Sequence, residues 1–465
     1  MVKTLKGFIS YLKKNQTKVQ KAVDVLVPGE IVNSYEPLME KSRQGPKSII
    51  LVTKINSDPK KQIVWKKSVK REGPYEIENN LQRQINIQNH PSYAGILPKS
   101  VGFGKSDFFA MEYFPEDSTL NKIKALNKSL LAIENDNHME PIQKAERKVE
   151  IYNSKLRLVR EGISLDAKFI TKGLKNTQDL PAEERKLELE KDMLANDLNT
   201  IIEYKKSLSE DERMKINNIL STIGNKYDNT ISHFAKLLAN QENSEFRIYN
   251  VHGDLGPHHV MGNRMIDIDS YKRDFEIADL ARWLKNPLVD IRDHNRVVAE
   301  MNYFVLRRLF YEGKIEEKQI YPEVMDVNNA LSSPKNNSHS SLEENINLRN
   351  ASGYPEKNFT KLIYLFYLKN LREDLRVLRH ISLSSNKDLI EYLGSDYVID
   401  EASDLKKTLN KWYSDDIHGA FDVLLSGYGR NTLMGNKKET IATIENLRSI
   451  VEGTISSMID SNPSK

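Results

Sequence analysis

The sequence predicts an α+β fold in which a small antiparallel β-sheet with one helix precedes a larger, mostly helical part. Short runs rich in β-branched and aromatic residues gather between residues 30 and 115. Apolar residues at helical spacing dominate from about 118 to 241, and this spacing returns from 276 onwards. With 465 residues, the chain is long enough for two or three units of ordinary domain size.

The composition is that of a globular protein whose chemistry depends on oxygen and nitrogen groups. Hydrophobic residues make up 39% of the chain and charged residues 29%. The 69 basic and 65 acidic residues are interleaved and leave a net charge of +4, which gives no support to a nucleic-acid partner. The absence of cysteine excludes disulfides, thiolate metal ligands and a thiol nucleophile, and is compatible with a reducing cytoplasm.

No stretch approaches the roughly 18 to 20 apolar residues of a membrane span, and the first residues lack the apolar core of a secretory signal. We therefore expect a cytoplasmic protein without a transmembrane segment. The N-terminal residues place Leu5, Phe8, Ile9 and Leu12 on one helical face, close to several lysines. Such a helix would lie on a membrane surface or dock on its own domain, and docking is favoured because apolar stripes normally face a core.

The sheet is predicted from four short β-rich runs around one helical segment. A turn at Asn56–Pro59 joins the first two runs into a hairpin, since Asn, Ser, Asp and Pro are frequent turn formers. The predicted order is strand 48–55, strand 62–69, helix 76–87, strand 97–103 and strand 108–114. We assign residues 1–115 to this first unit and residues 116–465 to a helical unit.

Two segments of the helical unit have an unusual composition. The stretch from about 140 to 207 is rich in Lys and Glu with few apolar positions, which indicates a projecting helical hairpin or lid, with a possible partner role. A structural excursion without a role of its own fits the same pattern. The tract from about 328 to 355 is rich in Ser and Asn and is predicted to be a flexible polar loop.

Residues 251–271, VHGDLGPHHVMGNRMIDIDSY, hold the best candidates for chemistry. A strand over 246–251 ends at His252-Gly253-Asp254, so that Asp254 lies on a loop at the strand end. Gly262-Asn263-Arg264 then separates two very short apolar runs and predicts a tight hairpin. This hairpin is expected to return Asp267 to the neighbourhood of the Asp254 loop.

The carboxylates of this segment are suited to phosphoryl transfer. Asp267 and Asp269 alternate on a chain that we expect to be extended, so both face one side and offer hard oxygen ligands for magnesium. Asp254 then serves as a base that orients an attacking hydroxyl. The alternative is a zinc or iron site built from His252, His258, His259 and Asp254, although their spacing fits no metalloenzyme pattern known to us.

The motif HGDLGPHH, followed by IDID and then ADLARWL (278–284), resembles the signature of the aminoglycoside and macrolide phosphotransferase family, to which choline kinases and spore-coat kinase-like proteins are related. The resemblance implies a protein-kinase-like two-lobed fold that uses ATP or GTP, Mg²⁺ and a small-molecule acceptor hydroxyl. It makes Asp254 the catalytic base, braced by His252. It also makes Asp267 the principal magnesium ligand, and Asp279 the residue that holds the catalytic loop.

One position departs from the family pattern. His259 occupies the place of an asparagine that binds the second metal in most relatives, although macrolide-type members often carry histidine there. An imidazole either ligates a metal or forms a hydrogen bond. The alternative function is therefore a catalytically degenerate member that binds a nucleotide or acts as a scaffold.

The same resemblance identifies candidates for nucleotide binding in residues 1–115. Lys66 shares a strand face with Val64 and is expected to grip the α- and β-phosphates, with Lys67 as the alternative because a slip of one residue changes the face. Glu78 on the following helix resembles the ion-pair partner of that lysine, and Glu76 competes with it.

The remaining nucleotide contacts are expected at the edge of the sheet. The backbone around Glu112 and Tyr113, in FFAMEYF, resembles the hinge that bonds the purine. The loop expected to cover the phosphates, SRQGPKS (42–48), offers a single glycine, Gly45.

Overall fold

The computed structural model of the chain divides into two compact units by its internal contacts. The sheet unit comprises residues 1–118, 172–182 and 258–271, and the helical unit comprises 119–171, 183–257 and 272–465. The structure describes residues 4–39, 43–44, 48–68, 77–103, 108–176, 187–203, 210–211, 214, 217–218, 221, 226–238, 248–286, 288–289, 291, 293–321, 339–385, 389, 405–426 and 437–460.

The sheet unit is built on an antiparallel sheet with the strand order β1-β3-β4-β6-β5, and β2 pairs with β3 beside this path. A tight turn at Asn56 and Ser57, with φ of 51° and 59°, joins the two longest strands. The strands are β1 (Tyr35–Pro37), β2 (Arg43–Gln44), β3 (Ser48–Ile55), β4 (Asp58–Ser68), β5 (Ser100–Gly102) and β6 (Phe108–Glu112). The predicted order of strands and helix is confirmed.

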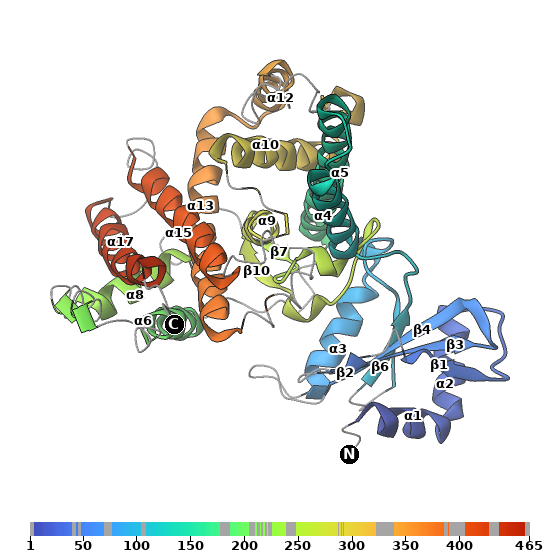
Figure 1. Ribbon diagram of the computed structural model, residues 1–465. Coiled ribbons are helices and arrows are strands. Elements are labelled where there is room, and N and C mark those ends of the chain that lie inside the picture. The colour runs from blue at the N-terminus through green and yellow to red at the C-terminus, as the bar shows by residue number, and fades with distance from the viewer. Residues whose placement is uncertain are drawn as a thin grey trace. The chain divides into compact units, whose positions relative to one another are not determined.

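Helices cover both faces of this sheet (Figure 1). One face, with Trp65 and Phe108, packs on α1 (Leu5–Lys13) and α2 (Gln16–Leu26). The other face, with Val64 and Phe109, packs on α3 (Ile77–Gln88). Phe8 of α1 is fully buried in the first cluster, so the N-terminal amphipathic helix docks on its own unit, as the favoured of the two interpretations states.

The segment 258–271 belongs with the sheet unit, although it is distant from the sheet in sequence. It forms the predicted hairpin from β8 (Val260–Met261) and β9 (Arg264–Met265). The N–H of Met265 donates to the carbonyl of Ile96 at 2.8 Å, and the hydroxyls of Tyr93 and Tyr271 lie 3.1 Å apart. These contacts fix the hairpin and the residues that follow it to the sheet unit.

In the helical unit, α13 is the central element, because it packs against α6, α9, α10 and α15. A two-stranded sheet of β7 (Ile248–Val251) and β10 (Lys272–Phe275) flanks the loop that carries Asp254. The helices are α4 (Thr119–Asn135), α5 (Pro141–Asn176), α6 (Leu187–Glu203), α8 (Lys226–Leu238), α9 (Ala278–Leu284), α10 (His294–Tyr311), α12 (His339–Ala351), α13 (Glu356–Leu383), α15 (Leu405–Leu425) and α17 (Lys437–Asp460).

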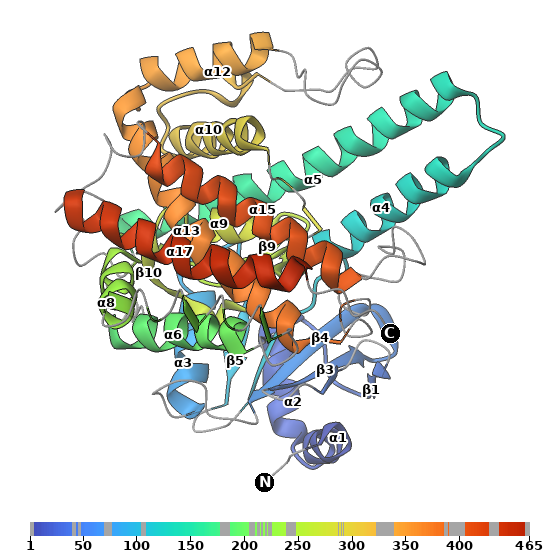
Figure 2. The same cartoon turned by 60° about the vertical axis from the view of Figure 1, so that its left-hand side comes forward.

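The expected hairpin over 140–207 differs from the structure. Both helices are present, but the long helical pair is α4 with α5, as Figure 2 shows, and Lys148 of α5 forms an ion pair with Glu134 of α4 at 3.2 Å. The second predicted arm, α6, packs against α8 and α13 with Leu194 and Leu198 buried. Its sparse apolar residues lie on one face, and this face is sufficient to place α6 in the core of the helical unit.

The polar tract at 328–355 also differs in part from the prediction. Residues 328–338 lie outside the described part of the chain, whereas α12 occupies His339–Ala351. The contacts of this helix explain its order, because the fully buried Arg349 donates to Asn302 on α10 at 3.0 Å and forms an ion pair with Glu356. Tertiary contacts therefore override a composition that favours a loop.

The fold class predicted from the sequence is confirmed as α+β, with a small antiparallel sheet and one helix ahead of a mostly helical remainder. This division into a sheet unit and a larger helical unit is the one expected of a two-lobed, kinase-like fold. Within the described residues, no helix is both long and apolar enough to cross a membrane.

Candidate active site

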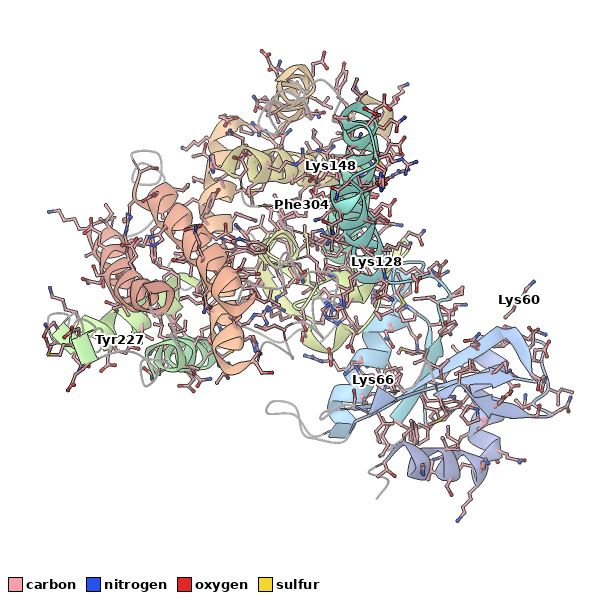
Figure 3. All side chains as sticks on the ribbon, in the orientation of Figure 1. Lys60, Lys66, Lys128, Lys148, Tyr227 and Phe304 are labelled. Carbon is pink, nitrogen blue, oxygen red and sulfur yellow. The ribbon has the colours of Figure 1, made fainter. Side chains whose placement is uncertain are left out.

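Lys66 is the centre of the first cluster of candidate residues. It lies on β4 opposite Ile50 and Phe109, on the sheet face that α3 covers, and its side chain is 7% exposed (Figure 3). Its Nζ bonds the Asp267 carboxylate and lies 3.5 Å from Oδ2 of Asp269. Lys67 points to the opposite face, where burial lowers its pKa. The structure therefore brings Lys66, rather than Lys67, to the predicted magnesium ligands.

The backbone around Asp267 explains how both carboxylates reach one lysine. We expected an extended chain here, and that expectation is wrong, because Ile268–Ser270 forms a short 3₁₀ helix. Asp267 precedes this helix with φ of 64°, a left-handed conformation that Asp adopts more readily than most residues. Arg83 of α3 holds the turn by donating to the carbonyl of Asp269 at 2.7 Å. A strained residue held by its surroundings is typical of functional sites.

His259 lies beside the same carboxylate. Its Nε2 is 3.7 Å from Oδ2 of Asp267, the side chain is 8% exposed, and its ring centroid lies 3.8 Å from that of His258. Its backbone carbonyl accepts a hydrogen bond from Ile266 at 2.9 Å. The imidazole is thus placed in contact distance of the predicted principal magnesium ligand.

The two carboxylates of this cluster fit magnesium. Among the described residues, no group of three or more His, Asp or Glu side chains is placed to hold a metal ion. His258 and His259 lie in the sheet unit and His252 and Asp254 in the helical unit, so the zinc or iron alternative stays a prediction. Magnesium is usually bound through one or two carboxylates, while water and substrate phosphates supply the other oxygens. Asp267 and Asp269 offer that donor set.

The second cluster surrounds Asp254 in the helical unit. Gly253 adopts φ of 85°, a conformation that requires glycine at this turn. The Asp279 carboxylate, buried on α9, accepts hydrogen bonds from the N–H of Gly253 at 3.0 Å and the N–H of Leu255 at 3.3 Å. Nδ1 of the fully buried His252 accepts from the N–H of Asp254 at 3.4 Å. These contacts hold the backbone on both sides of Asp254.

The sequence analysis missed Arg282, which contacts Asp254 directly. Arg282 lies one helical turn after Asp279 on α9, donates to the carbonyl of Gly253 at 2.8 Å and forms an ion pair with the Asp254 carboxylate. Its other edge meets Glu373 of α13 at 3.1 and 3.2 Å. Although burial alone would lower it, the carboxylates of Glu373 and Asp254 raise the pKa of Arg282.

A further buried carboxyl, Asp166 of α5, was not predicted either. Both of its oxygens are buried and have no hydrogen-bond partner within the described part of the chain. Burial, and secondly the charge of Asp279, raise the pKa of Asp166 well above its usual value. Asp166 is therefore neutral at a pH where an exposed aspartate is ionised. No sequence signal distinguishes it from a polar position on the amphipathic helix.

The other nucleotide-binding candidates are placed less completely. The N–H of Glu112 donates to the carbonyl of Lys99 at 3.0 Å, and its carboxylate accepts from the N–H of Lys99 at 3.0 Å. The predicted purine contact around Glu112 and Tyr113 stays a prediction. Glu78 lies in α3, but its side chain is outside what the structure describes, and Gly45 lies outside the described residues.

The candidate residues thus form two groups, each held within its own unit. The sheet unit brings together Lys66, Asp267, Asp269 and His259, and the helical unit brings together Asp254, His252 and Asp279. The expected proximity of Asp254 to Asp267 stays a prediction.

No protein-family model matches the chain, and no curated protein matches it. Among solved structures, the chain is similar to an ethanolamine kinase of Plasmodium vivax at 16% sequence identity and a TM-score of 0.37. The match covers 85% of this chain and 89% of that chain. A similarity of this size carries no argument about chemistry, which has to rest on the residues themselves.

Proposed function

We propose that the chain is a phosphotransferase that moves the γ-phosphate of ATP or GTP to a hydroxyl of a small-molecule acceptor. The observation that carries this proposal is the convergence of Lys66 on Asp267 and Asp269, about 200 residues later in the chain. A buried lysine beside two carboxylates matches the cation and magnesium ligands that phosphoryl transfer requires. The resemblance of residues 251–284 to the signature of the aminoglycoside and macrolide phosphotransferases and their choline-kinase relatives supports the same proposal.

In this mechanism Lys66 binds the phosphates, and Asp267 and Asp269 hold Mg²⁺, which neutralises phosphate charge when it is bound. Asp254 accepts the proton of the acceptor hydroxyl. The acceptor oxygen forms a bond to the γ-phosphorus, the bond from that phosphorus to the bridging oxygen breaks, and the nucleoside diphosphate leaves. Asp279 and His252 keep the Asp254 loop in place.

A degenerate, nucleotide-binding protein is the second candidate, and the observation that favours it is His259. Its imidazole lies 3.7 Å from the Asp267 carboxylate, where the family resemblance leads us to expect an asparagine. Loss of the second metal ligand would weaken transfer more than nucleotide binding. The two candidates therefore differ in turnover.

The test combines nucleotide binding with turnover. Thermal shifts with ATP and GTP, with and without Mg²⁺, are followed by transfer assays with choline, ethanolamine, a hexose, an aminoglycoside and a macrolide. We expect Lys66→Met to abolish the nucleotide shift, and Asp254→Asn to retain it while transfer falls by about 10²- to 10⁴-fold. The matched control is Lys60→Met, an exposed lysine on the same strand (Figure 3).

Absence of any nucleotide-dependent shift in the wild-type protein would refute the proposal. Nucleotide binding without transfer to any acceptor, and without phosphate release from MgATP, would favour the degenerate protein.

A further inference from the structure

One face of α9 binds both the backbone N–H and the backbone carbonyl of Gly253. Asp279 accepts from the N–H of Gly253, and Arg282, three residues later on the same helix, donates to the Gly253 carbonyl at 2.8 Å. Residues three apart on a helix are neighbours, so the two side chains act from one rigid surface. This arrangement fixes the direction in which the chain continues into Asp254.

We call these contacts of Asp279 and Arg282 with Gly253 the clamp. Arg282 extends the clamp to the carboxylate of Asp254. Its Nη1 contacts both the Gly253 carbonyl and Oδ1 of Asp254. The side chain of Asp254 is 43% exposed, whereas that of Arg282 is 19% exposed, so the anchor is more enclosed than the group that it holds. A planar guanidinium with several donors in fixed directions is suited to such a task, and an ammonium is not.

Arg282 is in turn fixed by α13. Its Nε and Nη2 donate to the two oxygens of Glu373 at 3.2 and 3.1 Å, a bidentate pair. Glu373 also accepts from Nε of Arg376 at 2.8 Å. Burial would raise the pKa of Glu373, but Arg282 and then Arg376 lower it well below its usual value. The anchoring carboxylate is therefore ionised throughout the neutral range.

We infer that Arg282 is a positioning residue that orients the Asp254 carboxylate for proton acceptance, and that Glu373 holds Arg282 in the required direction. The inference rests on the proposed function, because it assigns a role around the proposed base. Misplacement of a catalytic group by about 1 Å can reduce turnover 100-fold without affecting the binding of the other substrate. If Arg282 only joined α9 to α13, its replacement would instead lower the stability of the protein and leave kcat unchanged.

The test separates these roles through turnover and chemical rescue. In the transfer assay with MgATP and the best acceptor of the panel, we expect Arg282→Met to lower kcat by about 10- to 100-fold and to leave the KM for MgATP within about twofold. Arg282→Ala should regain part of its kcat when guanidinium is added at non-denaturing concentration. Arg282→Lys should keep only part of the wild-type kcat, because one ammonium cannot bind both carboxylates.

Glu373→Gln tests the anchor without removing Arg282. We expect kcat to fall about 3- to 10-fold, in the range of couplings between contacting residues, and the double variant with Arg282→Met to be no slower than Arg282→Met alone. The matched control is Arg376→Met, which removes another arginine from the same carboxylate but none from Asp254. Its kcat should stay within about twofold of wild type.

The outcomes distinguish this inference from the function on which it rests. A wild-type protein without transfer or MgATP-dependent phosphate release would overturn both. An active wild type with unchanged kcat in Arg282→Met would overturn the inference alone. If Arg282→Met fails to fold, an unchanged kcat in Glu373→Gln, or additive losses in the double variant with Arg282→Lys, would do so instead.

Discussion

Replacement of Gly162 by alanine tests the packing of α5 against α9, the helix that carries the clamp. A Cβ at Gly162 would lie 2.0 Å from Cζ2 of Trp283 and 2.4 Å from its Cη2, whereas carbon atoms normally approach to about 3.5–4.0 Å. The indole is 1% exposed and donates through Nε1 to the carbonyl of Val159 at 3.2 Å. Neither the helix backbone nor this ring can move away without disturbing its neighbours.

The magnitude follows from three contributions. Overpacking of a filled core costs about 1–3 kcal/mol, with the larger values expected for so close an approach. Loss of the indole hydrogen bond costs about 1 kcal/mol, and the higher helix propensity of alanine returns about 1 kcal/mol. We therefore expect Gly162→Ala to lower the free energy of unfolding by about 2–3 kcal/mol.

The matched control is Gly419→Ala, at an exposed position in α15 where an added Cβ meets nothing within 4 Å. This variant should gain up to about 1 kcal/mol, so the two substitutions have opposite signs. Denaturant titration followed by far-UV circular dichroism measures both, through the midpoint at unchanged slope. A gain in stability for Gly162→Ala similar to that of the control would refute the packing argument.

Two further predictions concern buried ionisable side chains of the helical unit. Because the folded-state pKa of Asp166 is raised, the unfolded state releases its proton first as pH increases, and the contribution of Asp166 to the stability of the wild type falls above about pH 4. Asp166→Asn should remove this loss, so its free energy of unfolding should gain about 1.4 kcal/mol per pH unit relative to the wild type, up to the folded-state pKa. A difference between variant and wild type that stays constant from about pH 4 to 7 would contradict this prediction. Lys369→Met should cost about 3 kcal/mol in denaturant titration, because it removes the buried lysine 2.7 Å from Asp274, which is 1% exposed, and leaves the partly exposed Lys272 at 3.6 Å. A loss below about 1 kcal/mol would disprove this.

The parts of the fold that were predicted correctly depend on local patterns. The short runs of β-branched and aromatic residues in β3 and β4 and the turn at Asn56–Pro59 predict the hairpin without information from elsewhere in the chain. Val64 and Lys66 are two residues apart and therefore share a face, but the sequence left Lys67 open as the alternative, and the ion pair of Lys66 with Asp267 decided between them. Where a pattern was too weak to fix the packing, as in α6, the helix was predicted but its neighbours were not.

The contacts that the sequence did not predict join residues far apart in the chain. Arg282 and Glu373 are separated by 91 positions, and Arg83 and Asp269 by 186. A single arginine on a helix is most often a solvated residue, so its type alone carries little information. The spacing of Asp279 and Arg282 was the available signal, because it places both on the face of α9 that the Asp-Leu-Ala motif directs toward the loop.

The side chains of Lys66 and Arg282, the two cationic groups at the candidate site residues, differ in a way that matches their proposed roles. Lys66 is a compact charge on a flexible stem, and its contacts to Asp267 and Asp269 can be exchanged for phosphate oxygens at little geometric cost. Arg282 has committed both edges of a rigid group, one to the Asp254 loop and one to Glu373. A site that binds and releases a nucleotide needs an exchangeable cation at the phosphates and a fixed one at the base. Lys66 and Arg282 have those respective properties, and this correspondence links the proposed function to the inferred clamp.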